Sequence, residues 1–532
     1  MKKYIIIVFS LLFMFGATSC DDWLDLRPEN DIVLEDFWRT KSDVESVLAA
    51  CYRSFSERAV IERMIVWGEL RSDNMVNGRS FPGDKPIYDM NRILDGNLTQ
   101  YNSYANWSSF YSIINTCNVL LHYAPLVLKQ DENFSQRDLN LVKGETLTLR
   151  ALAYFYLVRA FRDIPLITDP SIDDTQNYAV FQNTEEEVLD QIVADLNEVL
   201  SNNWVRDSYG DKEYDKGRIT RSAVNALLAD VYLWKEDYAN CIKACDEVLS
   251  NTNLKLITNA EQMYSQIFYF KNSTESIFEI QFNDKDMKND AIPELYSSLE
   301  NRTGYLTFPT RLGYNSSSQN AYTGPYSPFN YKISGSTESV DDIRSWSFIF
   351  YNGGDIYTIF KYAGTSAYKM TTGGNTTYRY GYSSNRTCNW IIYRLTDIML
   401  LKAEAMVQQE ADWEETISLV NQVYQRSNPD DEPLNPASYS SKKDREELVL
   451  RERHRELLFE GKRWFDLVRI ARRENSVANL NKFAVSKRQD SPAPLGARVM
   501  DAIYMPILKG ELDANTNLKQ NPYYEETSTS ER

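Results

Sequence analysis

Two segments of the chain have the pattern of a helical hairpin, and this pattern limits the fold more than any other feature of the sequence. In the stretch 217–250, apolar residues recur every three or four positions on both sides of a polar turn, Lys235-Glu236-Asp237. A second pair of the same kind spans residues 393–426. This spacing places the apolar side chains on one face of each helix. Because such faces must be buried against other elements, the pattern predicts a mainly α-helical core.

Four further segments repeat this helical spacing, at residues 42–55, 110–128, 141–162 and 184–200. At the start of the last one, Thr184 and Glu187 have the spacing of a capping box. The small residues in the two hairpins resemble those of tetratricopeptide-type units, which stack to bury one continuous core. We therefore expect a tetratricopeptide-like scaffold of helical hairpins, which by itself indicates no chemistry.

The middle of the chain differs from both ends. Residues 296–382 contain 13 of the 35 tyrosines, and Gly, Ser, Thr and Asn crowd the gaps between them. No helical period is sustained there, so we expect long irregular loops with a few short strands. Long ordered loops within a compact protein are usually functional.

The N-terminus has the pattern of a processing segment. A cationic start, Met1-Lys2-Lys3, precedes an apolar run that ends at Phe15, and small residues then lead to Cys20. A membrane-spanning helix needs about 20 apolar residues, so this run is too short for one and indicates a secretory signal peptide over residues 1–19. A cysteine directly after small residues looks like a bacterial lipobox, which predicts lipidation at Cys20 and a tether over residues 20–37. More than one acyl chain there would give stable anchoring.

Charge and residue counts exclude several classes of function. The formal charge of −17, from 58 Lys and Arg against 75 Asp and Glu, argues against a nucleic-acid partner. Two histidines, His122 and His454, leave little room for a histidine-based catalytic or metal site. We expect no catalytic residue, no cofactor and no metal from the motifs, although a structural calcium held by loop oxygens stays open.

The cysteines other than Cys20 do not form a disulfide framework. Five remain, an odd number without regular spacing. Cys241 and Cys245 are one helical turn apart on an amphipathic helix. We interpret them as small residues that fill the core, in preference to a redox or metal pair.

A charged segment near the C-terminus carries a family resemblance. Residues 444–473 interleave arginines and glutamates at helical spacing, which we interpret as a salt-bridged scaffold with Trp464 and Phe465 in the core. The segment resembles the signature helix pair of the SusD/RagB family of surface lipoproteins. The matching residues are Arg451-Glu452-Arg453, Arg455-Glu456-Leu457, Phe459-Glu460-Gly461 and Arg463-Trp464-Phe465-Asp466-Leu467. His454 stands where a second arginine is common in the family.

Other family-like segments follow in the expected order and cover essentially the whole mature chain. They are Gly68-Glu69-Leu70-Arg71-Ser72-Asp73-Asn74, the stretch 144–155, Gly217-Arg218, Tyr393-Arg394-Leu395-Thr396-Asp397, Tyr504-Met505-Pro506-Ile507 and Gln520-Asn521-Pro522-Tyr523-Tyr524. Tyr523 stands where the family often has glycine.

The resemblance implies an all-helical tetratricopeptide-like scaffold that bears irregular loops. It divides the chain into an N-terminal helical region, 38–275, and a C-terminal region with aromatic loops and terminal helices, 276–532. It also implies a surface-exposed protein of the outer membrane that covers a SusC-like TonB-dependent transporter and passes it a glycan. In the RagB branch of the family the ligand is a peptide. Members are generally not enzymes.

Two stretches, 71–107 and 301–331, combine the side chains that a glycan site needs. A pyranose stacks its C–H face on an aromatic ring, and its hydroxyls need hydrogen-bonding partners. Tyrosine suits this role because it is large and rigid with a polar tip. The candidate ligand-binding residues are Asn74, Arg79, Phe81, Tyr88, Tyr101, Trp107, Tyr305, Tyr314, Asn315, Tyr322 and Tyr326. The resemblance implies that loops from these two regions approach one another.

Other interpretations of the same residues stay open. The aromatic side chains would also suit loop packing or an interface with the transporter. A peptide receptor of the RagB kind, a surface hydrolase and a transporter lid without a ligand of its own are the alternative functions. A glycoside hydrolase needs two carboxylates about 5 to 10 Å apart across a sugar, and the sequence selects no such pair.

Overall fold

The fold is described from a computed structural model. It describes residues 37–78, 85–172, 178–299, 303–309, 328–329, 342–351, 357–383, 387–484, 497 and 499–528. The predicted signal peptide, Cys20 and all of the tether except its last residue lie outside these ranges. Within them, no helix combines the length and the apolar character that a membrane span requires.

Helices make up most of the first 250 residues. Their bounds are α3 (Lys41–Phe55), α4 (Arg58–Ile65), the π-helical turn η2 (Val66–Leu70), α5 (Lys85–Leu94), the short η3 (Ser103–Ala105), α6 (Ser108–Val127), α7 (Gln136–Phe161), α8 (Glu185–Ser201), α9 (Lys212–Gly217), α10 (Arg221–Trp234) and α11 (Tyr238–Leu249). The capping box predicted at Thr184 is confirmed: its side chain accepts from the Glu187 N–H, and the Glu187 carboxylate accepts from the Thr184 N–H.

Short helices and strands alternate in the middle of the chain, and longer helices return after it. The helices are α12 (Ala260–Tyr264), η4 (Ser265–Tyr269), α13 (Ala291–Leu295), α14 (Ile343–Ser347), α15 (Leu395–Gln408), α16 (Trp413–Ser427), η6 (Pro436–Ser438), α17 (Lys442–Glu456), α18 (Arg463–Glu474), α19 (Ala478–Ala484), η7 (Met500–Ile503), α20 (Lys509–Ala514) and α21 (Pro522–Ser528).

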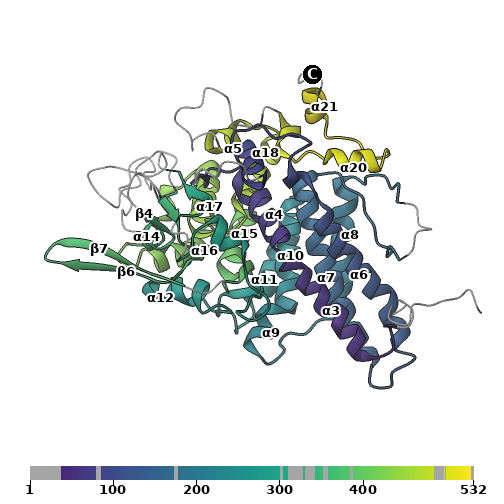
Figure 1. The fold of residues 1–532 in the computed structure, drawn as a ribbon. Coiled ribbons are helices and arrows are strands. Elements are labelled where there is room, and N and C mark those ends of the chain that lie inside the picture. The colour runs from purple at the N-terminus through teal and green to yellow at the C-terminus, as the bar shows by residue number, and fades with distance from the viewer. Residues whose placement is uncertain are drawn as a thin grey trace, which may run out of the picture.

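Both predicted helical hairpins are confirmed. Helices α10 and α11 form the first, with Glu236 at a φ of 61° in the turn between them. Helices α15 and α16 form the second, and its predicted first residues, Tyr393 and Arg394, instead end a strand. The pairs α3–α6, α7–α8, α10–α11 and α15–α16 pack successively against one another (Figure 1). This stacking gives the mainly α-helical, tetratricopeptide-like scaffold that the sequence predicts.

Within the described ranges, the strands form three small antiparallel sheets. A four-stranded sheet has the order β1 (Val76–Asn77), β3 (Leu306–Phe308), β5 (Tyr357–Ile359), β4 (Ile349–Tyr351). A buried pair joins β2 (Ser276–Ile280) to β8 (Trp390–Arg394). The hairpin of β6 (Gly364–Thr372) and β7 (Asn375–Tyr382) extends away from the body of the protein (Figure 1).

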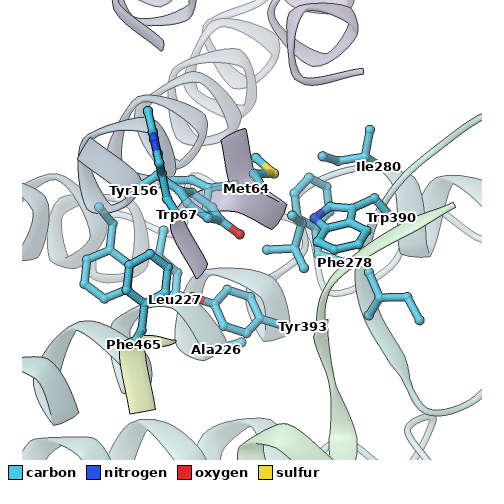
Figure 2. Close-up of a cluster of buried hydrophobic side chains, with 14 of the residues drawn as sticks. Met64, Trp67, Tyr156, Ala226, Leu227, Phe278, Ile280, Trp390, Tyr393 and Phe465 are labelled. Atoms are coloured by element: carbon cyan, nitrogen blue, oxygen red, sulfur yellow. The ribbon is translucent and has the colours of Figure 1, made fainter. Parts of the chain in front are cut away.

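One hydrophobic core joins segments that are far apart in the sequence. Figure 2 shows Trp67 of η2, Tyr156 of α7, Leu227 of α10, Phe278 of β2 and Phe465 of α18 gathered in one cluster. Trp464 and Phe465 are buried there, as predicted. Residues from both sides of position 275 therefore share this core, and the boundary drawn at that position stays a prediction.

Most charged residues between Glu452 and Arg469, in the helix pair α17–α18, are buried, and their partners differ from those that the sequence suggested. We expected opposite charges to meet along the helix, and Arg451 and Arg455 do pair with Glu447 and Glu452 in this way. The fully buried glutamates pair mainly with other elements. Glu456 binds Arg344 of α14, Arg394 of β8 and Arg426 of α16, and Glu460 binds Lys361 and Arg394. Helical periodicity cannot reveal partners that the tertiary fold supplies.

Candidate functional site

Strands β1 and β3 join the two aromatic stretches that the sequence selects. Val76 lies opposite Thr307, and Asn77 lies opposite Leu306. The ladder continues by one bond, in which the Gly78 N–H donates to the Tyr305 carbonyl oxygen at 2.8 Å. The stretches 71–107 and 301–331 therefore meet at one edge of the four-stranded sheet.

Two exposed tyrosines belong to the first of these stretches, which also contains α5, a helix that contacts β1. Tyr88 of α5 is 59% exposed, and Tyr101, just before η3, is 63% exposed. Their neighbours tie the two segments together, because Asn102 Nδ2 donates to the Asp89 carbonyl oxygen at 2.9 Å and the Ser103 N–H donates to Asp89 Oδ2 at 2.8 Å. The positions of the two tyrosines are thus linked through an ordered turn.

Polar groups accompany these rings. The Arg92 guanidinium lies over the Tyr88 ring, with 5.8 Å from its central carbon to the ring centroid. The Asn77 side chain is exposed at the end of β1, and Tyr305, the residue just before β3, is half-buried against the core. We call the candidate set Tyr88, Tyr101 and Tyr305 the aromatic face. It combines apolar rings with amide and guanidinium groups, which is the chemistry that a sugar requires.

A buried polar network holds the segment that leads into β1. The Glu69 carboxylate accepts from the Asn74 side chain and from the backbone N–H groups of Phe459 and Lys462. Burial raises the pKa of Glu69 to about 7. Asp73 pairs with Arg463, whose Nε is 2.9 Å from Asp73 Oδ1. Burial by itself would raise the pKa of Asp73, but the Arg463 charge outweighs it and lowers this pKa to about 2.

His454 completes this network from α17. Its Nε2 donates to Asn74 Oδ1, and Asp73 Oδ1 lies 3.8 Å away. Burial and the nearby Arg463 charge lower the pKa of His454 to about 3, so the imidazole is neutral at pH 7. His454, which stands where the resembling family commonly has arginine, therefore serves as a neutral hydrogen-bonding group in the core.

Two sequence-based candidates belong to the core and are corrected here. Asn74 is fully buried in the network just described, and Trp107 is 4% exposed with its ring against Tyr111 and Phe161. Neither side chain reaches the surface, so we remove both from the ligand-binding set. The aromatic count of the segment could not separate core rings from exposed ones, because both kinds occur within a few residues of each other.

The remaining candidates divide by whether the structure describes them. Tyr88, Tyr101 and Tyr305 stay in the set. Six residues lie outside the described residues, and their assignment stays a prediction: Arg79, Phe81, Tyr314, Asn315, Tyr322 and Tyr326.

A further exposed aromatic group was not among the candidates. Tyr368 on β6 is 54% exposed, and Arg379 on β7 lies directly opposite it. The sequence does contain a signal for this hairpin. Tyr378, Tyr380 and Tyr382 alternate as strand residues do, and Gly373-Gly374 marks the turn. Both glycines have positive φ values, 61° and 82°, as such a turn requires.

The other predictions about chemistry are tested only over the described residues. Cys241 and Cys245 are buried without a disulfide, which confirms that they fill the core. A search of the same residues for groups of three or more His, Cys, Asp and Glu that could hold a metal ion finds none.

Comparison with known proteins agrees with this architecture. Residues 347–524 match the family model described as the SusD family, and residues 22–233 match one described as starch-binding associating with outer membrane. The SusD-like protein P38 of Formosa agariphila is 27% identical, with 98% of this chain and 100% of that protein covered. A SusD-like protein of Bacteroides ovatus is 24% identical, with 88% and 82% covered.

Solved structures show the same fold. A SusD homolog from Bacteroides thetaiotaomicron has a TM-score of 0.70 at 22% identity, with 93% of this chain and 100% of that chain covered. Surface glycan-binding protein A from the same organism, solved in complex with laminarihexaose, has a TM-score of 0.66 at 19% identity, with 91% and 99% covered. The two family models match successive parts of the chain, curated relatives match it nearly end to end, and the fold agrees throughout: the protein belongs to the SusD/RagB family.

Proposed function

We propose that the protein is a cell-surface lipoprotein that captures an oligosaccharide or polysaccharide and delivers it to a SusC-like TonB-dependent transporter in the outer membrane. The observation that carries this proposal is the β1–β3 pair, which joins the two aromatic stretches, the first of which also carries the exposed rings of Tyr88 and Tyr101. An exposed tyrosine ring can stack on the C–H face of a sugar, and its hydroxyl can hydrogen-bond to the ligand.

The family supports a binding role over a catalytic one. One matching family model is described as starch-binding, and one structural neighbour was solved with a bound hexasaccharide. We propose accordingly that the chain is not an enzyme, that it needs no cofactor, and that lipid at Cys20 anchors it to the outer membrane. Two or more acyl chains would make this anchor stable.

The expected affinity is modest. We expect dissociation constants from micromolar to millimolar, which correspond to binding free energies of about −8 to −4 kcal/mol. Two or three rings stacked on the sugar, with a few hydrogen bonds, can supply this free energy. Such affinity suits a receptor that must release its ligand to a transporter.

Calorimetric titration of residues 21–532 tests the proposal. Neutral plant, fungal and host glycans are titrated alongside a peptide digest. Saturable heat with one glycan class is the expected result. Heat with peptides only would contradict it and favour a RagB-like peptide receptor, the alternative function. If neither glycans nor peptides give heat, the remaining function is a transporter lid that binds no ligand of its own. Co-purification with the transporter would then be measured.

Hydrolysis is tested in the same samples. The proposal predicts that the glycan is recovered at its original length after long incubation. Shorter products from purified protein would instead establish a surface hydrolase.

A further inference from the structure

A cleft of about 800 Å³ lies along strand β6 and is lined by the β6–β7 hairpin and by neighbouring elements of the protein. Its other wall comes from the start of α12, from α14 and from the turn after α16. Of the described residues that line it, none belongs to β1, β3 or α5, so the cleft is distinct from the aromatic face. Its volume lies in the range of about 300–1,000 Å³ that is typical of ligand pockets.

The hairpin wall presents a ring beside a cation. Tyr368 and Arg379 are direct partners in the ladder, and opposed residues project from the same face of a two-stranded sheet. This face is opposite to the one from which Tyr378 and Tyr380 pack against Trp346. Both side chains are exposed. A tyrosine ring stacks on the C–H face of a sugar, while a guanidinium donates hydrogen bonds to the hydroxyls around it.

The opposite wall supplies acceptors. Glu261 of α12 and Asp430 of the turn after α16 are exposed carboxylates that line the cleft. Carboxylate oxygens accept hydrogen bonds from hydroxyl groups. The formal charges of the described lining cancel, because Lys369 and Arg379 balance Glu261 and Asp430. A lining without net charge offers a polyanion no net electrostatic attraction, so it favours a neutral ligand.

Trp346 of α14 contributes to the lining of the cleft and is 8% exposed. Its indole Nε1 is buried and is not accessible from the cleft. A ligand can therefore contact the exposed part of this residue but not its N–H group.

The hairpin wall is held in place before any ligand binds. The Tyr380 hydroxyl donates to the Trp346 carbonyl oxygen at 2.9 Å. The Tyr378 ring lies 5.5 Å from the Trp346 ring, and the Tyr380 ring lies 4.4 Å from that of Phe350, between centroids. A preformed wall lowers the entropic cost of binding.

We propose that the cleft along β6 is a binding site for a neutral oligosaccharide, additional to the aromatic face. This inference rests on the proposed function, because it assigns a second contact to the same class of ligand. An extended peptide paired with the β6 edge is the competing occupant. Peptide addition of that kind gains specificity from pockets for alternate side chains, whereas the exposed lining here is largely polar and charged.

Two variants of residues 21–532 test the cleft by calorimetric titration with the neutral glycan that the unaltered protein binds. Tyr368→Ala and Arg379→Ala are each expected to raise the dissociation constant about tenfold, which corresponds to about 1.4 kcal/mol. The matched control is Tyr214→Ala, because Tyr214 is 59% exposed on α9 and lies outside the cleft. All three variants should keep the melting temperature of the unaltered protein, since the substituted side chains are exposed.

The outcomes separate this inference from the proposed function. If Tyr88→Ala and Tyr101→Ala weaken glycan binding while the two cleft variants do not, the cleft inference is overturned and the function stands. If the unaltered protein binds no glycan, the proposed function fails and the inference fails with it. Binding of a peptide digest that Tyr368→Ala abolishes would also overturn the inference, in favour of the peptide occupant.

Discussion

The carbonyl oxygen of Gly461 lies against the Cα of Gly68, so close that a Cβ on Gly68 would be 1.8 Å from it. Gly68 is in η2, and Gly461 is in the turn between α17 and α18 with a φ of +70°. Two segments that resemble the family at the sequence level are thus in direct backbone contact. The approach excludes any side chain at position 68.

Gly68→Ala is expected to destabilise the protein by about 3 kcal/mol or more, because the clashing atoms are backbone and cannot rotate away. The matched control is Gly510→Ala, since a Cβ at Gly510 meets no atom within 4 Å. In a helix this control should be neutral or stabilising by about 0.5–1 kcal/mol. Denaturant unfolding measures the free energy of unfolding of both variants. Equal stability of the two variants would show that the close approach is not maintained in solution.

Arg344→Met is expected to reduce the free energy of unfolding by about 3–5 kcal/mol, because it leaves buried carboxylates without their partner. Arg344 is fully buried and pairs with Asp342, Glu452 and Glu456. The control Lys509→Met removes an exposed pair with Asp513 and should cost less than about 1 kcal/mol. Thermal and denaturant unfolding of both variants measure these two changes in the free energy of unfolding. A small effect at Arg344 would mean that the network tolerates rearrangement.

Because His454 is buried as a neutral imidazole, we expect the protein to lose stability in acid. The pKa of His454 is lowered from 6.5 to about 3 in the folded state, so the unfolded chain binds the proton first as the pH falls. Its contribution to the free energy of unfolding is fully present above pH 6.5. It is lost as the pH falls from 6.5 toward 3, by about 5 kcal/mol in total at 1.36 kcal/mol for each pKa unit.

His454→Gln removes this titration and should flatten the dependence of stability on pH in that window. Urea unfolding at a series of pH values between 4 and 8 measures it. His122→Gln changes an exposed histidine and controls for loss of an imidazole. An unchanged slope in the His454 variant would assign the acid sensitivity to other groups.

Substitutions on the aromatic face should separate binding from stability. Tyr88→Ala and Tyr101→Ala are each expected to weaken glycan binding about fivefold, from the loss of about 1 kcal/mol of stacking, with no change in melting temperature. Trp107→Ala should instead cost about 3–5 kcal/mol of stability, because its ring is in the core. Calorimetry and thermal unfolding of the same samples test this. If losses of binding at Tyr88 and Tyr101 track losses of stability, the assignment of the face is wrong.

The sequence predicted the helical parts of the fold well because their signals are local. Apolar spacing located the α10–α11 and α15–α16 hairpins, and the Thr184–Glu187 pair located the start of α8. It predicted the site less well. Asn74 and Trp107 have the residue types of a glycan site, yet packing assigns both to the core.

The sequence by itself determined the helical scaffold, the family resemblance and the two aromatic stretches, because periodicity, capping and motifs depend on residues within a few turns of each other. Only the tertiary structure decided which rings are exposed, which distant arginines neutralise Glu456, and how β1 pairs with β3. It alone also revealed the cleft beside Tyr368. Burial and contacts between distant segments arise when the helices pack, and no local pattern of residues specifies them.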